Sequence, residues 1–176
     1  MSQAINKWSL TPAASRREAG RRRLGGVSGS PPIRPAHEAD LDSVAALWLA
    51  SRRTAGTAIP ATIHTDDEVR DWFRDLVFPT AEVWLIGAHL KPEAMMVLSG
   101  PSVDQLYVAP GHQRQGHGSR LIRFAQQRRD ALSLWTFEAN HTARRFYEKL
   151  GFAPVGPASR ENEEGEPALL YRWTKS

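Results

Sequence analysis

Residues 103–118 read Val-Asp-Gln-Leu-Tyr-Val-Ala-Pro-Gly-His-Gln-Arg-Gln-Gly-His-Gly, which predicts a strand, a turn and the start of a helix. Two glycines in the turn, Gly116 and Gly118, let the backbone approach a ligand closely. Successive N–H groups at a helix start form a concave positive site that suits a pyrophosphate, and Arg114 adds a full charge. The stretch therefore predicts a loop that binds a phosphate-bearing cofactor.

Two common phosphate-binding motifs do not fit this loop. The dinucleotide motif needs a third glycine and the P-loop needs Gly-Lys-Ser/Thr, and neither follows Gly118. The loop resembles instead the phosphate loop of the GNAT superfamily of acyl-CoA N-acyltransferases. In that family Gln/Arg-x-x-Gly-x-Gly/Ala follows a hydrophobic strand that ends in Val-x-Pro, and residues 108–110 and 113–118 match both parts.

A second segment carries the same resemblance. Residues 140–152 read Asn-His-Thr-Ala-Arg-Arg-Phe-Tyr-Glu-Lys-Leu-Gly-Phe, which is similar to the GNAT motif Asn-x-x-Ala-x-x-Phe-Tyr-x-x-x-Gly-Phe. The resemblance extends over residues 33–173 and implies a single α/β (α+β) domain. It also implies a mixed, mostly antiparallel sheet of about seven strands, splayed between strands four and five, with helices on both faces.

Composition divides the chain into two regions. Residues 1–30 carry six Lys or Arg and one Glu, whereas the whole chain has a net charge of +4, so residues 31–176 have a net charge of −1. We expect residues 1–32 to be a disordered basic tail and residues 33–176 to be the N-acetyltransferase domain. The tail is interpreted as a solvated extension or a start codon placed too early, with an organellar transit peptide and nucleic-acid contact as alternatives.

Composition also limits the classes of function. The chain has no cysteine, which excludes a disulfide, a thiolate nucleophile and a Cys-based metal site. It has no apolar run of the roughly 18 residues that span a membrane. We therefore expect a soluble, cytoplasmic protein with no membrane or nucleic-acid partner and no metal.

Local signals predict the helices. Asp40 is expected to cap a helix that begins at Leu41. Residues 65–68, Thr-Asp-Asp-Glu, form a capping box that opens a second helix, which Pro79 is expected to stop. Two further helices are predicted from about residue 116 to 129 and from residue 140 onward, with Gly151 as the left-handed residue after the last one.

The strands are predicted from apolar runs between turn signals. Residues 82–88 and 93–99 have hairpin spacing, with a turn expected around Lys91 and Pro92. Further strands are predicted at residues 33–36, up to residue 108, and at 133–137, 152–155 and 169–173. The resulting order is β-α-α-β-β-β-α-β-α-β-β, which is the GNAT order.

The resemblance implies the residues that hold acetyl-CoA. Backbone groups at Leu106, Tyr107 and Val108 would contact the pantetheine arm where the sheet splays at a bulge. The phosphate loop would comprise Gln113, Arg114, Gln115, Gly116, His117 and Gly118. Asn140 would bond the pantetheine arm or simply cap a helix, and Arg144 would reach the phosphates or remain solvated. The side chains of His112 and His117 are interpreted as solvated loop histidines.

Tyr147 is the candidate general acid for the departing thiolate, although its position on an apolar stripe also fits a core residue. The strand-five position at which family members carry a Glu is Trp135, and the familiar strand-four position is Ser102. Asp104, two residues on, is therefore the first choice for general base, followed by Glu138 and His64. A base that acts through water stays open.

The acceptor is expected to be a primary amine, either a small molecule or an amino-acid-like compound. Residues 160–166 hold four acids and one base, and form either a negative rim beside the acceptor pocket or a solvated loop. Closure by residues 51–63 would favour a small acceptor, and an open groove would favour a protein Lys or N-terminus. A non-catalytic acyl-CoA sensor is the alternative from another class, and a homodimer is expected from the family.

Overall fold

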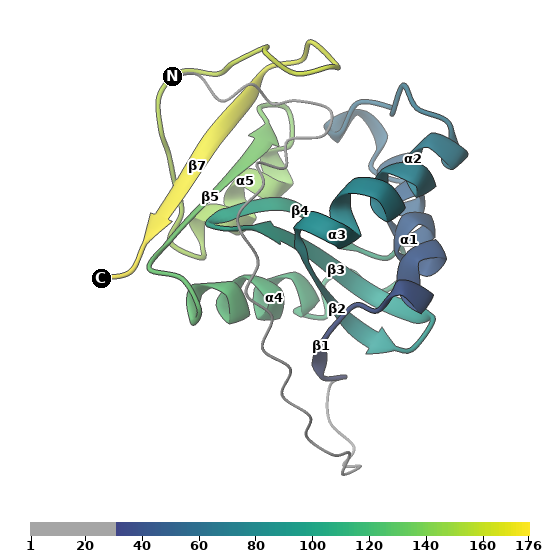
Figure 1. Ribbon diagram of the computed structural model, residues 1–176. Helices are drawn as coiled ribbons and strands as arrows, with labels where there is room; N and C mark the ends of the chain where they lie inside the picture. The colour runs from purple at the N-terminus through teal and green to yellow at the C-terminus, as the bar shows by residue number, and fades with distance from the viewer. Residues whose placement is uncertain (1–30) are drawn as a thin grey trace.

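An interior strand of the sheet, β3 (Lys91–Ser99), carries five consecutive apolar residues at positions 94–98. Such a run is typical of a strand that is covered on both faces, and all five side chains are buried. The computed structural model describes residues 31–176 and has helices on both faces of this strand (Figure 1). All but the last two residues of the predicted N-terminal tail lie outside the described residues.

The element order confirms the predicted succession. The strands are β1 (Ile33–Pro35), β2 (Glu82–Ala88), β3, β4 (Ser102–Val108), β5 (Ala131–Phe137), β6 (Ala153–Pro154) and β7 (Ala168–Thr174). The α-helices are α1 (Leu41–Arg53), α2 (Asp66–Trp72), α3 (Phe78–Thr80), α4 (His117–Gln126) and α5 (His141–Glu148). Short 3-10 turns η1 (Glu38–Asp40) and η2 (Gly56–Ala58) flank α1, and a π-helical turn η3 (Phe73–Val77) joins α2 to α3.

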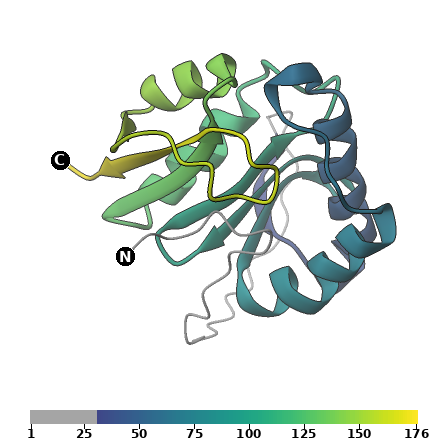
Figure 2. The same ribbon diagram turned by 90° about the horizontal axis from the view of Figure 1, so that it is seen from above.

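The seven strands form one sheet in the order β1-β2-β3-β4-β5-β7-β6. The β4–β5 pair alone is parallel, and its register contains a single pair of partners, Ser102 and Ser133. Beyond that pair β4 and β5 separate, so the predicted splay between strands four and five is confirmed. Figure 2 shows β5 and β7 turned away from β2, β3 and β4 on the side where the β6–β7 loop crosses above them.

The two faces of β3 belong to two hydrophobic cores. Met95 and Val97 pack with α1, α2 and η3 on one face, whereas Met96 and Leu98 pack with α4 and β5 on the other. Helices α1 to α3 therefore cover one side of the sheet, and α4 and α5 cover the other (Figure 1). No helix within residues 31–176 combines the length and the apolarity that crossing a bilayer requires.

The capping box is confirmed at the start of α2, where Thr65 Oγ1 accepts from the Glu68 N–H and Glu68 Oε2 accepts from the Thr65 N–H. The prediction that Pro79 stops this helix is wrong, because the helical path continues to Thr80. The Phe78 N–H bonds to the Phe73 carbonyl in the π-helical turn. This wider turn just before Pro79 relieves the crowding that a proline ring causes in a regular α-helix.

The predicted turn at Lys91 and Pro92 is also wrong, since both residues lie in β3. The chain reverses at Leu90, which has a φ of 60°. Pro92 pairs with Gly87 at a β-bulge, where a proline in a strand is tolerated. A Cβ on Gly87 would lie 2.6 Å from the Lys91 carbonyl oxygen, so the close approach of the two strands requires glycine there.

Asp40 precedes α1 as predicted, but its side chain does not cap that helix. The carboxylate is fully buried and forms a bidentate pair with Arg34, with N···O distances of 2.7 and 2.9 Å. It also accepts from the N–H groups of His37 and Leu90. Asp40 therefore ties β1 and the β2–β3 turn to the start of α1, and the Arg34 guanidinium holds its pKa well below the usual range.

We expect Asp40→Asn to lower the free energy of unfolding at neutral pH by about 3 kcal/mol, because it breaks a buried ion pair. The folded-state pKa of Asp40 is depressed, so its stabilisation is present above the unfolded carboxyl pKa of about 3.9 and is lost as the pH falls below it. Urea unfolding at several pH values measures both effects. Asp42→Asn, at an exposed position of α1, is the control, and an equal loss in both variants would contradict the assignment.

Candidate active site

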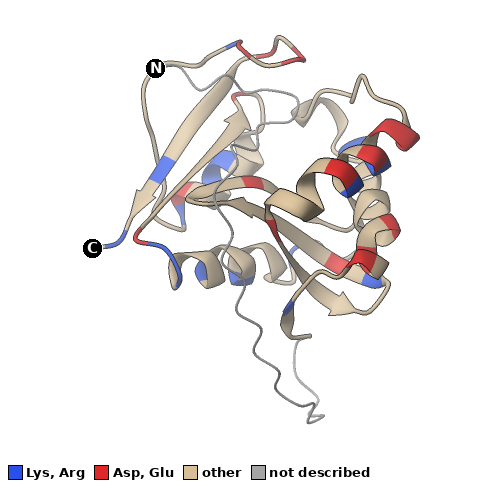
Figure 3. Ribbon diagram, viewed as in Figure 1, with Lys and Arg blue, Asp and Glu red and all other residues tan. Residues whose placement is uncertain are grey.

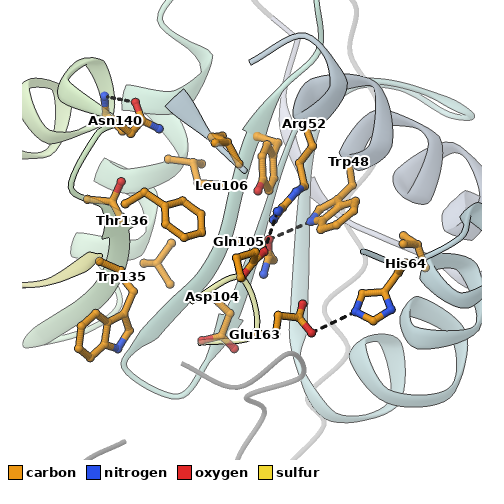
Figure 4. A pocket seen from close by; sticks show the side chains of 18 of the residues that line it. Trp48, Arg52, His64, Asp104, Gln105, Leu106, Trp135, Thr136, Asn140 and Glu163 are labelled. Atoms are coloured by element: carbon orange, nitrogen blue, oxygen red, sulfur yellow. Dashed lines mark hydrogen bonds and ion pairs between the residues drawn. The ribbon is translucent and has the colours of Figure 1, made fainter. Parts of the chain in front are cut away.

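A pocket of about 200 Å³ lies where β4 and β5 separate. Its walls come from α1, the segment before α2, β4, β5, α5 and the β6–β7 loop. In Figure 4, Trp135 and Thr136 of β5 lie on one side, Trp48, Arg52 and His64 lie on the other, and residues of β4 lie between them. The parted strands thus open one concave site within the described residues.

Asp104 lies at a β-bulge on the floor of this pocket. Val97 pairs with Gln105 and Leu98 with Val103, so Asp104 is the extra residue of β4. Its carboxylate accepts a hydrogen bond of 2.6 Å from the Ser102 hydroxyl and another from the Ser99 hydroxyl. Burial raises the pKa of Asp104 to about 6, and the two serine hydroxyls partly oppose that rise.

Tyr147 extends from α5 into the same pocket and is 8% exposed. Its ring packs against Phe146 and Phe152, with centroid distances of 5.1 and 5.8 Å. Burial raises the pKa of the phenol, and the neighbouring Tyr107 adds to the rise. The side chain is therefore both a core residue and a neutral phenol at the pocket wall.

One edge of β4 is left without a strand partner beyond Ser102. Leu106, Tyr107 and Val108 pair with β3 on one side, and the β5 ladder does not reach them on the other. Leu106 and Tyr107 line the pocket, whereas the Val108 carbonyl accepts from the Ser51 hydroxyl at 3.3 Å. Main-chain groups along this edge can pair with an extended ligand.

The predicted phosphate loop is exposed from residue 113 to residue 116 and leads directly into α4. Arg114 and Gly116 have φ values of 62° and 83°, a conformation that turns successive backbone groups toward one side. Gly118 serves helix packing, since a Cβ there would lie 3.2 Å from the Phe146 ring. Helices α4 and α5 each carry two Arg, whereas α2 carries four Asp or Glu (Figure 3).

The interpretation of His117 as a solvated loop residue is wrong. Its side chain is 4% exposed, and Nε2 lies 3.0 Å from Oε2 of Glu93 on β3. His112 is 44% exposed and lies 3.6 Å from the same carboxylate oxygen. The histidine became buried because the turn folds back onto β3, a long-range contact that local sequence does not encode.

Asn140 caps α5, since its Oδ1 accepts from the Ala143 N–H at 3.0 Å, and it also lines the pocket. Arg144 donates to the Tyr171 hydroxyl at 3.3 Å and to the Glu138 carbonyl at 3.2 Å. These bonds hold Arg144 on the side of β7. Glu138 is exposed and does not line the pocket, so of the three candidate bases only Asp104 and His64 lie in it.

The mouth of the pocket is crossed by one ion pair and one contact between a histidine and a carboxylate. Arg52 on α1 lies 2.8 Å from Glu164, and His64 lies 3.0 Å from Glu163 (Figure 4). Two of the four acids in the 160–166 loop are therefore paired, and the expected negative rim is partly neutralised. Sequence reasoning did not identify Arg52 as a site residue, because its partner lies 112 positions away.

The Arg52 guanidinium also lies over the Trp48 ring, 4.8 Å from its centroid. Trp48 in turn donates to the Gln105 side chain at 2.9 Å and packs edge-on against Tyr107. Alternate residues of β4 are thus fixed from the α1 side. Nothing in the local sequence marked Trp48 or Gln105 as pocket residues, since each reads as part of an ordinary helix or strand.

Comparisons with known proteins agree with this geometry. The family profile described as "Acetyltransferase (GNAT) domain" matches residues 82–154. The peptidyl-lysine N-acetyltransferase YiaC of Escherichia coli is 28% identical over 142 residues, which are 80% of this chain and 95% of YiaC. The solution structure of apo-form YjaB from Escherichia coli has a TM-score of 0.65 and 25% identity, and the match covers 82% of this chain and 98% of YjaB.

A third relative shares the fold alone. The structure of yncA from Salmonella typhimurium, solved with its cofactor acetyl-CoA, has a TM-score of 0.62 at 16% identity and covers 83% of this chain and 94% of that one. Together, the parted sheet and the matched profile define an acetyl-CoA-dependent N-acetyltransferase. Within that class, residues 82–154 match the GNAT acetyltransferase domain, and the fold around them is shared with GNAT N-acetyltransferases.

We expect the Asp104 carboxyl to titrate with a pKa of about 6. Ser102→Ala should move this pKa further upward, because it removes a hydrogen bond that favours the carboxylate. Carbon-13 NMR of the side-chain carboxyl across a pH series measures both values. Ser43→Ala removes a hydroxyl that bonds the Asp40 carbonyl instead, and it should leave the titration unchanged. An Asp104 pKa near 4 would contradict the burial argument.

Proposed function

We propose that this enzyme transfers the acetyl group of acetyl-CoA to a primary amine by direct attack in a ternary complex, with a small molecule as the acceptor. The observation that carries the proposal is a carboxyl with a pKa of about 6 in the same pocket as a neutral, buried phenol. Acid–base catalysis commonly uses a pair of titratable groups, one in an environment that suits accepting a proton and one in an environment that suits donating it. The chain has no cysteine that could form an acyl-enzyme.

The described residues fit the cofactor in two places. The exposed turn before α4 and the basic character of α4 suit its phosphates, which residues 113–118 would bind through backbone N–H groups. The free edge of β4 at residues 106–108 would pair with the amides of the pantetheine arm. Asn140 would add a polar contact from the pocket wall, and Arg144 would need to leave Tyr171 to reach a phosphate. When bound, acetyl-CoA supplies the thioester.

Asp104 would act as the general base. An alkylammonium has a pKa of about 10.4, so its proton must be removed before the nitrogen can attack. A carboxylate whose pKa is raised from 3.8 to about 6 is roughly a hundredfold stronger as a base than an ordinary Asp, and most of it is still ionised at neutral pH. The same negative charge would attract the ammonium before it loses its proton. Paired with Glu163, His64 is the second candidate in the pocket.

Tyr147 would act as the general acid. The new C–N bond forms as the C–S bond breaks, and the departing sulfur takes up a proton from the phenol. Because burial raises the pKa of Tyr147, the phenol keeps its proton across the physiological pH range. The balance of the reaction is an ammonium and a thioester on one side, and an amide, a thiol and a released proton on the other.

The geometry of the mouth favours a small acceptor. The pairs Arg52–Glu164 and His64–Glu163 tie the β6–β7 loop across the pocket to α1 and to the segment before α2. These contacts support a substrate that enters a narrow site over one that lies in an open groove. A second candidate acceptor is a peptidyl lysine, which the similarity to YiaC and YjaB supports, because a lysine side chain is a thin primary alkylamine.

The proposal is tested by free-thiol release from acetyl-CoA in the presence of polyamines, amino acids, aromatic amines and lysine peptides. We expect saturable turnover with one class of small primary amine, at a kcat/KM at least about tenfold above that for lysine peptides, a difference of about 1.4 kcal/mol in transition-state binding. The reverse order would favour the peptidyl-lysine function. No turnover in any class would contradict the proposed acceptor.

A catalytic control accompanies this screen. Tyr147→Phe should lower kcat by about 10²-fold and leave the KM for acetyl-CoA within a few-fold, since loss of a general acid acts on the chemical step. The packing of the ring against Phe146 and Phe152 should persist in this variant. An unchanged kcat would remove Tyr147 from the mechanism without affecting the acceptor result.

The phosphate loop has its own test. Gly116→Val should weaken acetyl-CoA binding at least about tenfold, since a β-branched residue resists the positive φ that shapes the turn. Gly100→Val is the matched control, because Gly100 also has a positive φ with open space around it but lies in the β3–β4 turn. Isothermal titration with CoA measures the loss of affinity in each variant, and thermal melting measures any loss of stability. Equal loss of CoA affinity in both variants would overturn the loop assignment.

A further inference from the structure

Three potential metal ligands converge beneath the phosphate loop. Glu93 lies on β3, His112 lies in the turn after β4, and His117 is the first residue of α4. One ligand atom from each of the three side chains lies within 4.8 Å of the other two. The proposed catalytic residues are elsewhere, so the acetyl-transfer chemistry does not account for this cluster.

His117 shows that the cluster is incomplete as it stands. The side chain is 4% exposed, and neither ring nitrogen has a hydrogen-bond partner within residues 31–176. Buried polar atoms are nearly always satisfied, so such an atom calls for an explanation. Nε2 faces Oε2 of Glu93 at 3.0 Å without the geometry of a hydrogen bond, which leaves a carboxylate and an imidazole directed at a common point.

Two of the three distances between ligand atoms are close to the edge of a zinc-centred tetrahedron, and all three lie within 4.8 Å. Zinc binds imidazole nitrogen and carboxylate oxygen at about 2.0–2.2 Å, which places neighbouring ligand atoms about 3.3 Å apart. These two distances, 3.0 Å from His117 Nε2 to Glu93 Oε2 and 3.6 Å from His112 Nδ1 to the same oxygen, bracket that value. The two imidazole rings are tilted by 32°, with centroids 6.5 Å apart, so both can turn a nitrogen toward one ion.

The backbone holds the three ligands in place. The Ala109 N–H donates to the Glu93 carbonyl at 2.8 Å, and the His112 N–H donates to the Ala109 carbonyl at 3.0 Å. The turn that carries His112 is therefore attached to the residue that supplies the carboxylate. His117 is fixed by its burial at the start of α4. A site on such elements needs little rearrangement to bind an ion.

We propose that Glu93, His112 and His117 bind a divalent transition metal, Zn²⁺ by donor set and spacing, with the fourth position open to a water or another small ligand. Two His and one carboxylate with an open position form a known zinc donor set. The ion connects both ends of the exposed turn, residues 113–116, to β3. It therefore holds the phosphate loop in one conformation and stabilises the folded chain by mass action.

The test uses the full chain without a polyhistidine tag, freed of metal by chelation and titrated with Zn²⁺ alone. We expect one ion per chain by isothermal titration and a rise of about 5–10 °C in the melting temperature at a hundredfold excess over Kd. Titration with Co²⁺ should give the intense visible absorption of tetrahedral cobalt, and Zn²⁺ should displace it. Neither readout depends on acetyl transfer, so the outcome is separate from the proposed function.

Variants of the two partly exposed ligands identify the site. His112→Ala and Glu93→Gln should each weaken Zn²⁺ binding at least about tenfold, and neither removes the buried His117 ring. His89→Ala is the matched control, because His89 also lies beside a carboxylate, 3.3 Å from Asp40, but has no second histidine. Absence of one-to-one binding, or equal loss of affinity in the His89 variant, would overturn the metal site.

Discussion

The separation of β4 from β5 after Ser102 is the constraint on which the site depends. If the parallel ladder continued, the groups at residues 106–108 would be bonded within the sheet, and no pocket would exist between the strands. The two hydrophobic cores stabilise the separated strands, since each side of the parted sheet packs against its own helices. An unpaired β-edge can pair with the strand of another chain and promote aggregation, and a ligand that occupies the edge prevents this pairing.

The bulge at Asp104 follows from the same separation. A bulge adds one residue to β4, increases its local twist and directs the carboxylate into the opening. Burial in the opening disfavours the charged form, while Ser99 and Ser102 keep the carboxyl hydrogen-bonded. The structure therefore combines unfavourable burial with satisfied hydrogen bonds, and the result is a carboxyl whose pKa is raised toward neutral pH.

The features that could be predicted from sequence are those with short-range causes. The capping box at Thr65, the left-handed Gly151 and the turn before α4 depend on neighbouring residues, and the family resemblance supplied the splay. The failures have long-range causes. The sequence around Asp40 predicts a helix cap, but its side chain pairs with Arg34 and with the β2–β3 turn. The helix continues past Pro79 because a π-helical turn precedes the proline. The pairs that cross the mouth join residues about 100 positions apart, which no local pattern encodes.

The distance between Asp104 on β4 and the proposed phosphate loop that follows β4 also limits which ligands the pocket can bind. Asp104 and Val108 are four residues apart on an extended strand, which corresponds to about 13 Å, and the phosphate loop begins only after Pro110. A ligand whose phosphates lie at the loop and whose reactive group lies at Asp104 must therefore be long, thin and able to bond to a strand edge. The spacing along one strand thus agrees with the proposed phosphate-anchored cofactor and its extended arm of amides, and in that proposal the amine acceptor enters from the end of the pocket that Arg52 and Glu164 line.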